Sequence, residues 1–417
     1  MEFSDFGNRF SATSGIGVLM DDLGDLLASD REYLMLGGGN PARIPAVVDE
    51  YRACMTRLGE DEDRFFNAVG SYDAPGGAGN LVKALVKLFN ESYDWDLDTS
   101  NVVLTNGSQN AFFLLFNMFA GPSKGSKRKI LLPMTPEYIG YEDVAINENF
   151  FVSQKPLIDI VGEKRFKYRI DLDKLKVTDD IGAICVSRPT NPTGNVITDV
   201  ELDSLDQLAL SNGIPLIIDN AYGEPFPDII HSEVSLRWHP NVILSMSLSK
   251  LGLPALRTGI IIAAPEVTRT IRQMNAIINL TPGSLGPAMV YELFESGEIL
   301  NLSRSHIKPF YKKKAEQALR WFDQAHEGLP AFAHCAEGSI FLWLWFQQLP
   351  ITADELYQRL KQRGVIIVPG QYFFPGIDAS WQHCHECIRV NYAMDDVIVQ
   401  QGISIIAEEV KKAYQNT

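Results

Sequence analysis

Short runs of apolar residues without alternation recur through the middle of the chain, separated by segments with helical spacing. The predicted strands are NVVLTNG (101–107), KILLP (129–133), GAICVS (182–187), PLIIDNAY (215–222) and NVILSMSLSK (241–250). Helical spacing marks 46–59, 81–93, 108–121 and 199–211. Strands that are buried on both faces read as continuous apolar runs, and helices connect these runs along the chain. The pattern therefore predicts an α/β fold with a mostly parallel sheet covered by helices.

The two ends of the chain depart from this pattern. The first forty residues are polar and end in LGGGNP (36–41), which is typical of an arm that folds onto another part of the protein. Beyond Pro287 a long helical stretch leads to IFLWLWF (340–346), a helix over 354–363, and the strand-like GVIIVPG and CIRVNY. We expect an N-terminal arm over 1–45 that joins the small domain, a large domain over 46–290, and a small C-terminal α+β domain over 291–417.

Composition and charge indicate which classes of partner the protein is expected to bind. A net charge of −15 over 417 residues disfavours nucleic acid and anionic membrane surfaces. The most apolar short run, IFLWLWF, is far below the roughly 20 residues that span a bilayer. Five cysteines, an odd number, do not form a disulfide framework, and the N-terminus lacks a basic segment followed by an apolar run. We therefore expect a cytoplasmic protein that acts on small molecules, with no nucleic acid and no membrane partner.

One lysine has neighbours that suit a phosphorylated aldehyde. In SMSLSKLGLPALR (245–257), Lys250 lies between hydroxyl residues and a Gly/Pro-broken turn that ends in Arg257. The amine can form a Schiff base while Ser247, Ser249 and Arg257 surround a phosphate. A plain surface turn is the alternative from this segment alone.

Several polar residues follow the predicted strands. Asp219 and Tyr222 come in IIDNAYG, and Asn191 begins the NPTG turn. Near a lysine-bound pyridine aldehyde, the Asp219 carboxylate keeps the ring nitrogen protonated, while Tyr222 and Asn191 can donate to the ring oxygen. The alternatives are a helix cap or turn at Asp219 and an ordinary Asn-Pro turn.

Other candidate contacts lie further apart in the sequence. TNGSQ (105–109) presents backbone N–H groups and the Ser108 hydroxyl at a helix start, which suits a phosphate or is an ordinary N-cap. Tyr138 can stack on a ring, or lie exposed in a loop. Arg389, inside an apolar strand-like segment, requires a partner such as a substrate carboxylate or a structural ion pair. The three glycines of LGGGNP allow a close approach to a ligand, or form a hinge.

A group of histidines and cysteines over 383–387 has ligand types that zinc prefers. No second pair of ligands with matching spacing follows it. We therefore expect no metal site.

The motifs TNGSQ, PEYIGY, NPTGN, DNAY, SLSKLGLPALR and IRVNY occur in this order across 36–392 together with the glycine segment. This series resembles the fold type I aminotransferases, which depend on pyridoxal 5′-phosphate (PLP). The resemblance implies that Lys250 carries the Schiff base, that Asp219 binds the pyridine nitrogen, and that Tyr138 stacks on the ring. The other implied contacts are Asn191 and Tyr222 to the ring oxygen; Gly107, Ser108, Gln109, Ser247, Arg257 and the neighbouring subunit's Tyr72 to the phosphate; and Arg389, Asn191, Gly38 and Gly39 to the substrate.

The resemblance also implies the reaction. It indicates a ping-pong transaminase that moves an amino group between valine or 2-oxoisovalerate and alanine or pyruvate, acting as a homodimer with shared active sites. A PLP-dependent lyase or racemase is an alternative, because the same lysine and aspartate serve any Cα carbanion. A ligand sensor is a further alternative, although such a protein is expected to carry a basic DNA-binding module. Arg188 departs from the uncharged residue of many relatives and forms a structural pair or tunes the pocket.

Overall fold

A computed structural model of the chain describes residues 2–11, 14–17, 20, 22, 24 and 32–415. Its central sheet has eight strands in the order β2-β11-β10-β9-β8-β4-β3, with β5 paired to β4. The strands are β2 (Val102–Thr105), β3 (Gly121–Ser123), β4 (Ser126–Leu132), β5 (Phe151–Ser153), β8 (Ile181–Ser187), β9 (Leu216–Asp219), β10 (Val242–Ser247) and β11 (Gly259–Ile262). Strands β5, β4, β8, β9 and β10 pair in parallel, whereas β11 runs antiparallel to both β10 and β2.

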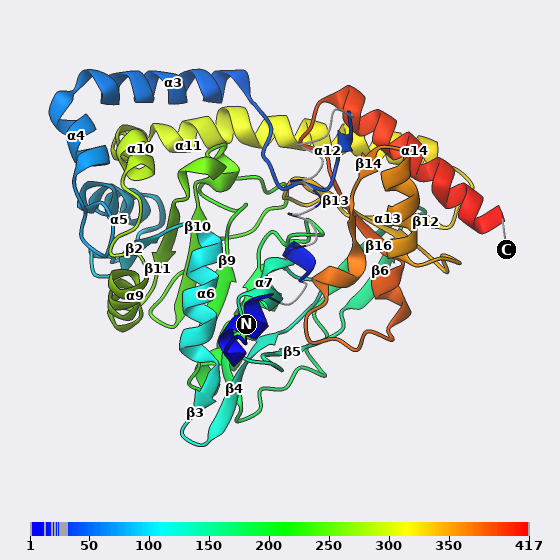
Figure 1. The fold of residues 1–417 in the computed structure, drawn as a ribbon, viewed down its shortest axis with the longest axis horizontal. Coiled ribbons are helices and arrows are strands. Elements are labelled where there is room, and N and C mark those ends of the chain that lie inside the picture. The colour runs from blue at the N-terminus through cyan, green and yellow to red at the C-terminus, as the bar shows by residue number, and fades with distance from the viewer. Residues whose placement is uncertain are drawn as a thin grey trace.

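Helices cover this sheet, as the apolar strand runs predict. Every residue of β2, β8, β9, β10 and β11 is buried. The helices are α3 (Pro45–Glu60), α4 (Glu62–Gly70), α5 (Gly79–Tyr93), α6 (Ser108–Phe119), α7 (Gly140–Asp143), α8 (Asp199–Ser211), α9 (Pro265–Ile278) and α10 (Leu285–Glu295). Figure 1 shows α6 across the front of the sheet, with α5 and α9 beside β2 and β11. The predicted α/β class with a mostly parallel sheet is confirmed.

The helix α8 illustrates how local sequence sets an element's start. The Thr198 hydroxyl accepts a hydrogen bond from the backbone N–H of Glu201, and the Glu201 carboxylate accepts one from the backbone N–H of Thr198. This reciprocal capping satisfies two donors at the helix start that have no partner inside the helix.

A second sheet of six strands lies beside the first, on the right of Figure 1. Its order is β15-β16-β13-β12-β7-β6. The strands are β6 (Leu157–Val161), β7 (Arg165–Arg169), β12 (Ala331–His334), β13 (Phe341–Phe346), β15 (Val368–Pro369) and β16 (Cys387–Asn391). The strands β6 and β7 come from the middle of the chain, so two distant segments build this sheet.

The remaining helices pack with the second sheet or lead to it. They are α11 (Glu298–Leu302), α12 (Lys308–Ala325), α13 (Ala353–Gln362) and α14 (Asp396–Gln415), and the short α1 (Asp5–Ser11) lies near the N-terminus. One π-helical turn, Ser303–Ile307, joins α11 to α12. The segment β1 (Leu34–Met35) pairs in parallel with β14 (Val365–Ile366), which brings the glycine segment next to β16. Among the described helices, none has the length and apolar character needed to cross a membrane.

The parallel strands bring the polar residues at their ends to one edge of the central sheet. Ser187 at the end of β8 pairs with Asp219 at the end of β9, and Asp219 pairs with Ser245 of β10. The carboxyl edge of a parallel sheet is where ligands gather in α/β folds. The segment that carries Lys250 follows β10 at this edge.

Candidate active site

Lys250 lies in the turn that follows β10, partly buried at the sheet edge. Its Nζ donates a hydrogen bond of 2.7 Å to the carbonyl oxygen of Gly39 and lies 5.4 Å from the centre of the Tyr222 ring. Burial, together with the positive charges of Arg389 and Arg257, lowers the pKa of the Lys250 amine to about 8. A substantial fraction of the amine is therefore neutral near physiological pH, as a nucleophile or general base requires.

Asp219 supplies a buried carboxylate close to this lysine. One carboxylate oxygen accepts a hydrogen bond of 3.1 Å from the Ala221 N–H, and the other accepts one of 2.8 Å from the Tyr141 hydroxyl. Burial raises the pKa of Asp219 to about 6, against the opposing effects of these hydrogen bonds and of Lys250. The carboxylate is therefore mostly ionised at pH 7 and can hold a protonated ring nitrogen.

Arg389 lies inside β16, only 2% exposed. Its guanidinium donates to the side-chain oxygen of Asn191 at 2.9 Å and to the carbonyl oxygen of Gly37 at 2.7 Å, and it lies 4.1 Å from the centre of the Phe341 ring. Burial lowers its pKa to about 10, so it stays positively charged. Within the described part of the chain it forms no ion pair, which leaves its charge available for an anion.

Several buried polar atoms at this site have no hydrogen-bond partner among the described residues. Two of them are the hydroxyl oxygen of Tyr222 and Nε of Arg389. A buried polar atom without a partner loses its hydration and gains nothing in return. Both atoms are therefore suited to bind a group that enters the site.

A second cluster lies at the start of α6. Gly107 caps this helix with φ 86°, in the region that favours glycine, and Ser108 and Gln109 form the first turn. A Cβ on Gly107 would lie 2.3 Å from Nη2 of Arg257, so only glycine lets the guanidinium come this close. Gln109 and Arg257 also line one cavity of about 500 Å³. The helix start and the guanidinium together suit an anion such as phosphate.

Ser247 completes this cluster through the strand pairing. It pairs with Gly259, which in turn pairs with Thr105 at the end of β2, and a Cβ on Gly259 would lie 2.7 Å from the backbone carbon of Gly107. The Ser247 hydroxyl donates a hydrogen bond of 2.9 Å to the Ser249 hydroxyl. The predicted phosphate-binding residues of this chain thus lie together.

The glycine segment lies against the lysine and the arginine. The side-chain amide of Asn391 donates to the carbonyl oxygen of Gly38 at 2.7 Å, and the Gly39 carbonyl accepts from Lys250. The structure therefore brings Gly38 and Gly39 to the same site as Arg389, as the sequence predicts.

Tyr138 and Tyr72, predicted to contact the cofactor's ring and phosphate, lie in different surroundings. The Tyr138 ring lies 5.5 Å from the Tyr141 ring, and a Cβ on Gly140 would contact both Tyr138 and Gln109. Tyr138 is thus close to Asp219 and to the start of α6. Tyr72 lies in the loop between α4 and α5 with 83% of its surface exposed. In the described single chain no hydrogen bond or ring contact joins Tyr72 to the site.

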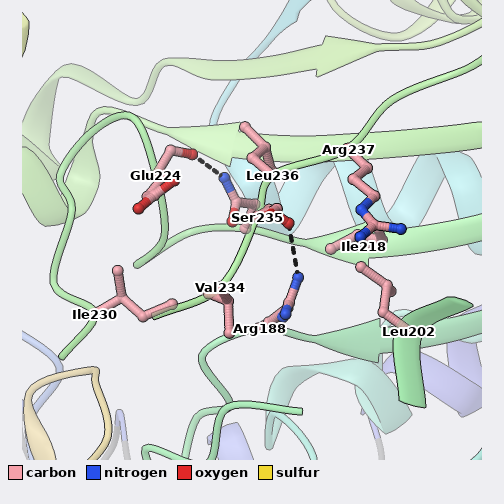
Figure 2. A pocket seen from close by; sticks show the side chains of 10 residues that line it. Arg188, Leu202, Ile218, Glu224, Ile230, Val234, Ser235, Leu236 and Arg237 are labelled. Carbon is pink, nitrogen blue, oxygen red and sulfur yellow. Dashed lines mark hydrogen bonds between the residues drawn. The ribbon is translucent and has the colours of Figure 1, made fainter. Parts of the chain in front are cut away.

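Arg188 turns away from this site. Its guanidinium donates to the carbonyl oxygens of Ile197 at 2.9 Å and Ser235 at 3.0 Å, and it pairs with Asp199 at 2.5 Å. Figure 2 shows it pointing to Ser235 in a separate pocket of about 10 Å³, roughly the space of one water molecule. The sequence leaves two roles for Arg188, a structural pair or tuning of the pocket. The structure shows a structural pair, with Asp199.

The histidine and cysteine group lies in a 3-10 turn, Gln382–His385, and at the start of β16 in the second sheet. His383 Nε2 is 2.5 Å from the Tyr168 hydroxyl and 3.7 Å from the Cys387 sulfur. Burial lowers the pKa of His383 to about 3. Among the residues that the structure describes, no three His, Cys, Asp or Glu side chains form a group that could hold a metal ion.

Comparison with models of protein families identifies the family of the chain that carries this site. The model of aminotransferases of class I and II matches residues 52–406. The chain belongs to this family. An aminotransferase exchanges amino groups between amino acids and 2-oxo acids with PLP as cofactor, so the predicted family, enzyme class and cofactor are confirmed.

Individual relatives are similar to this aminotransferase in sequence or structure along nearly its whole length. It is 48% identical over 415 residues to the valine–pyruvate aminotransferase of Escherichia coli K12, covering 99% of both chains. The crystal structure of valine–pyruvate aminotransferase from Salmonella typhimurium LT2 matches with a TM-score of 0.89 and 49% identity, covering 97% of this chain and all of that one. An aspartate aminotransferase from Thermus thermophilus, 17% identical, has a TM-score of 0.79 over 98% of this chain and 100% of that one, which shows the shared fold.

The residues of this aminotransferase fit PLP chemically. An amine with a lowered pKa would suit an aldehyde carbon, a buried carboxylate would suit a protonated pyridine nitrogen, and the Tyr222 hydroxyl, unpartnered among the described residues, would suit the ring oxygen. The close contact of Gly107 with Arg257 forms a cradle that any larger side chain would fill. These features match the four polar parts of the cofactor: its aldehyde, ring nitrogen, ring oxygen and phosphate.

Four polar residues of the site are not singled out by the sequence patterns. Tyr141 binds Asp219, Ser187 and Glu137 lie behind Tyr141, and Asn391 holds the glycine segment. Tyr141 and Glu137 do belong to the motif PEYIGY, and Ser187 ends a predicted strand. Their one sequence signal is a polar side chain beside an apolar run, which also occurs at ordinary turns.

Proposed function

We propose that this aminotransferase moves an amino group between valine or 2-oxoisovalerate and alanine or pyruvate, with PLP held at Lys250. The observation that carries the proposal is the convergence of three side chains at one sheet edge. Lys250 has a lowered pKa, Asp219 is a buried carboxylate, and Arg389 is a buried cation with no ion pair to any residue that the structure describes. Similarity to the valine–pyruvate aminotransferase of E. coli supports the choice of substrates.

The cofactor contacts follow from the site. Lys250 would bind the aldehyde carbon, Asp219 the ring nitrogen, and Asn191 and Tyr222 the ring oxygen, with Tyr138 against the ring. The phosphate would lie among Gly107, Ser108, Gln109, Ser247 and Arg257. When bound, PLP withdraws electrons from the substrate's Cα and so stabilises the negative charge that forms when the Cα proton leaves.

The protein's own contribution to the reaction is proton transfer and substrate orientation. Lys250 as a neutral amine takes the Cα proton and gives it back at a different carbon, and its pKa of about 8 suits both steps. Arg389 binds the substrate carboxylate with two parallel N–H groups, which fixes which face of the Cα meets Lys250. Asn191 orients the guanidinium through their hydrogen bond.

The choice of an aliphatic substrate has a physical support besides similarity. A cavity of about 350 Å³ is lined in part by Lys250. Ile44, Val47, Leu251 and Ile307 are among its other lining residues. Its aliphatic walls favour a branched apolar side chain, and Arg43, which also lines the cavity, would repel a positively charged one.

We also propose a homodimer in which Tyr72 reaches the neighbouring subunit's phosphate site. Exposed apolar side chains support it: Phe65, Phe66 and Val69 on α4 are 48%, 60% and 56% exposed, and Ile277 at the end of α9 is 83% exposed. Apolar side chains grouped on a surface are typical of protein interfaces. The division into an arm (1–45), a large domain (46–290) and a small domain (291–417), and the cytoplasmic location, remain predictions.

Amine-donor profiling tests the proposed function. Purified protein with PLP and pyruvate is given valine, aspartate or lysine, and 2-oxo acid formation is measured with and without pyruvate. Valine should be the best donor of the three, and its 2-oxo acid should exceed one equivalent per active site only when pyruvate is present. Lys250→Ala should abolish turnover. No turnover of valine would overturn the substrate assignment, and formation of many equivalents of 2-oxo acid per active site without an acceptor would indicate a lyase.

A further inference from the structure

Three side chains form a continuous series of oxygen contacts behind Asp219. The Tyr141 hydroxyl donates to Asp219 at 2.8 Å and lies 3.1 Å from the Ser187 hydroxyl. The Ser187 hydroxyl in turn contacts one carboxyl oxygen of Glu137, while the other accepts a hydrogen bond of 2.9 Å from the Ser187 N–H. Tyr141 and Glu137 are 0% exposed, and Ser187 is 2% exposed.

The number of protons limits how this series can bond. Three oxygen–oxygen contacts join Glu137 to Ser187, Ser187 to Tyr141, and Tyr141 to Asp219. Each hydrogen bond requires one proton, and the two hydroxyls supply only two. If all three contacts are hydrogen bonds, the third proton resides on a carboxyl at one end, either Glu137 or Asp219.

The surroundings place this proton on Glu137. Burial, with a smaller contribution from the negative charge of Asp219, raises the pKa of Glu137 to about 8, although the Ser187 hydrogen bonds oppose it. Asp219 keeps the lower pKa of about 6, partly because Lys250 lies near it. Glu137 forms no ion pair within the described part of the chain, so no positive charge there offsets the cost of ionising it.

We propose that Glu137 is a protonated positioning residue for Asp219. Its carboxyl proton bonds the Ser187 oxygen, so the Ser187 proton turns to Tyr141 and the Tyr141 proton turns to Asp219. All three hydrogen bonds then point the same way, and the last one holds the Asp219 carboxylate in its ionised form and orientation. The assignment rests on the proposed function, because Asp219 needs a fixed negative charge only if it binds a protonated ring nitrogen.

The groups that face Glu137 come from several elements. Asp219 from β9, Tyr141 from α7 and Cys185 from β8 interact with it electrostatically, and the adjacent Tyr138 bonds it through its backbone. Burial raises the pKa of the Tyr141 hydroxyl and of the Cys185 thiol well above their usual values. Both stay neutral near pH 7, so Asp219 is the one of these groups that changes charge in the same range as Glu137.

Infrared difference spectra of the cofactor-free protein test the protonation directly. Subtracting the spectrum of Glu137→Gln from that of the wild type at pH 7 should reveal the carbonyl band of a protonated carboxylic acid. The matched control is Glu201→Gln, since Glu201 is also buried but accepts hydrogen bonds from backbone N–H groups. The control difference should lack the band. Absence of the band in the Glu137→Gln difference would overturn the proposal.

Cofactor affinity tests the positioning role. Glutamine can donate to the Ser187 oxygen as a protonated glutamate does, so Glu137→Gln should bind PLP within about twofold of the wild type. Glu137→Leu and Tyr141→Phe break the series and should weaken PLP binding by about tenfold or more, as expected for a lost hydrogen bond to a charged group. Equal weakening in Glu137→Gln and Tyr141→Phe would overturn the role.

The two measurements also separate this proposal from the proposed function. A wild type that binds no PLP would contradict the proposed function, whereas the infrared band of the cofactor-free protein depends on neither PLP nor turnover. If Glu137→Leu does not fold, the comparison of Glu137→Gln with Tyr141→Phe still decides the role.

Discussion

The Lys250 amine donates a hydrogen bond of 2.7 Å to the carbonyl oxygen of Gly39, two residues beyond the carbonyl that Arg389 binds. Both contacts fall on one short glycine segment. The side chain of Asn391 holds this segment to β16 by donating to the Gly38 carbonyl at 2.7 Å and to the Asn40 carbonyl at 3.3 Å. One strand thus carries both the arginine and the amide that positions the segment facing the lysine.

Replacing Asn391 should loosen this segment. Asn391→Ala removes the bonds to two carbonyl groups and the bond of 2.6 Å from the Ala393 N–H. We expect the free energy of unfolding to fall by about 2–3 kcal/mol, and KM for the amino acid to rise more than kcat falls. Urea unfolding and steady-state kinetics measure both. Asn301→Ala, on an exposed turn of α11, is the matched control and should change stability by less than about 0.5 kcal/mol. A KM equal to that of the wild type would contradict the positioning role.

The lowered pKa of Lys250 predicts a pH-dependent stability of the cofactor-free protein. The folded-state pKa of about 8 lies below the value of 10.5 for an exposed lysine, so the unfolded chain binds more protons between these two values. The charged amine therefore costs the folded protein stability below pH 8, and this cost disappears as the pH rises to 10.5. Lys250→Met should be more stable than the wild type at pH 7 by up to about 3 kcal/mol.

The difference between the two proteins should shrink on going from pH 7 to pH 10. Guanidinium unfolding of both cofactor-free proteins at the two pH values measures it. A difference that is the same at both pH values would show that the Lys250 amine titrates as it does in the unfolded chain.

Replacing Arg389 should reduce kcat/KM mainly for substrates that carry a carboxylate. Its buried guanidinium has neutral partners, Asn191 and Gly37, so a substrate carboxylate would be its counter-charge. Arg389→Lys loses the paired N–H geometry and should reduce kcat/KM for valine by about 10–100-fold. The reduction for isobutylamine, which is valine without its carboxylate, should be several-fold smaller. Equal losses for both substrates would assign Arg389 a structural role.

The sequence predicts the central sheet well because its strands are buried on both faces. Continuous apolar runs of this length, such as those of β8 and β10, are typical of buried strands, and each ends in a polar residue that marks the sheet edge. The second sheet is less predictable. Its strands β6 and β7 carry exposed and charged side chains, and β7 pairs with β12 at a sequence separation of more than one hundred residues. Local patterns contain no information on such distant pairing.

The site residues also differ in whether the sequence alone predicts them. Lys250, Asp219 and Arg389 are rare residue types in apolar surroundings, so a sequence singles them out. Tyr141 and Asn391 act only through contacts with Asp219 and Gly38, which depend on how β9, α7 and β16 meet. A partner of this kind requires the tertiary fold before its role can be inferred.

The exposure of Tyr72 leads to a test of shared active sites. Its side chain is 83% exposed in the single chain, although the predicted role places it at a phosphate. Tyr72→Ala and Lys250→Ala should each be nearly inactive as homodimers. In a mixed dimer, one site combines both substitutions and the other has neither. A 1:1 mixture after subunit exchange should then recover about a quarter of wild-type activity, because half of the dimers are mixed and each has one intact site. If Tyr72 serves its own chain, no mixed dimer has an intact site, and activity should not recover.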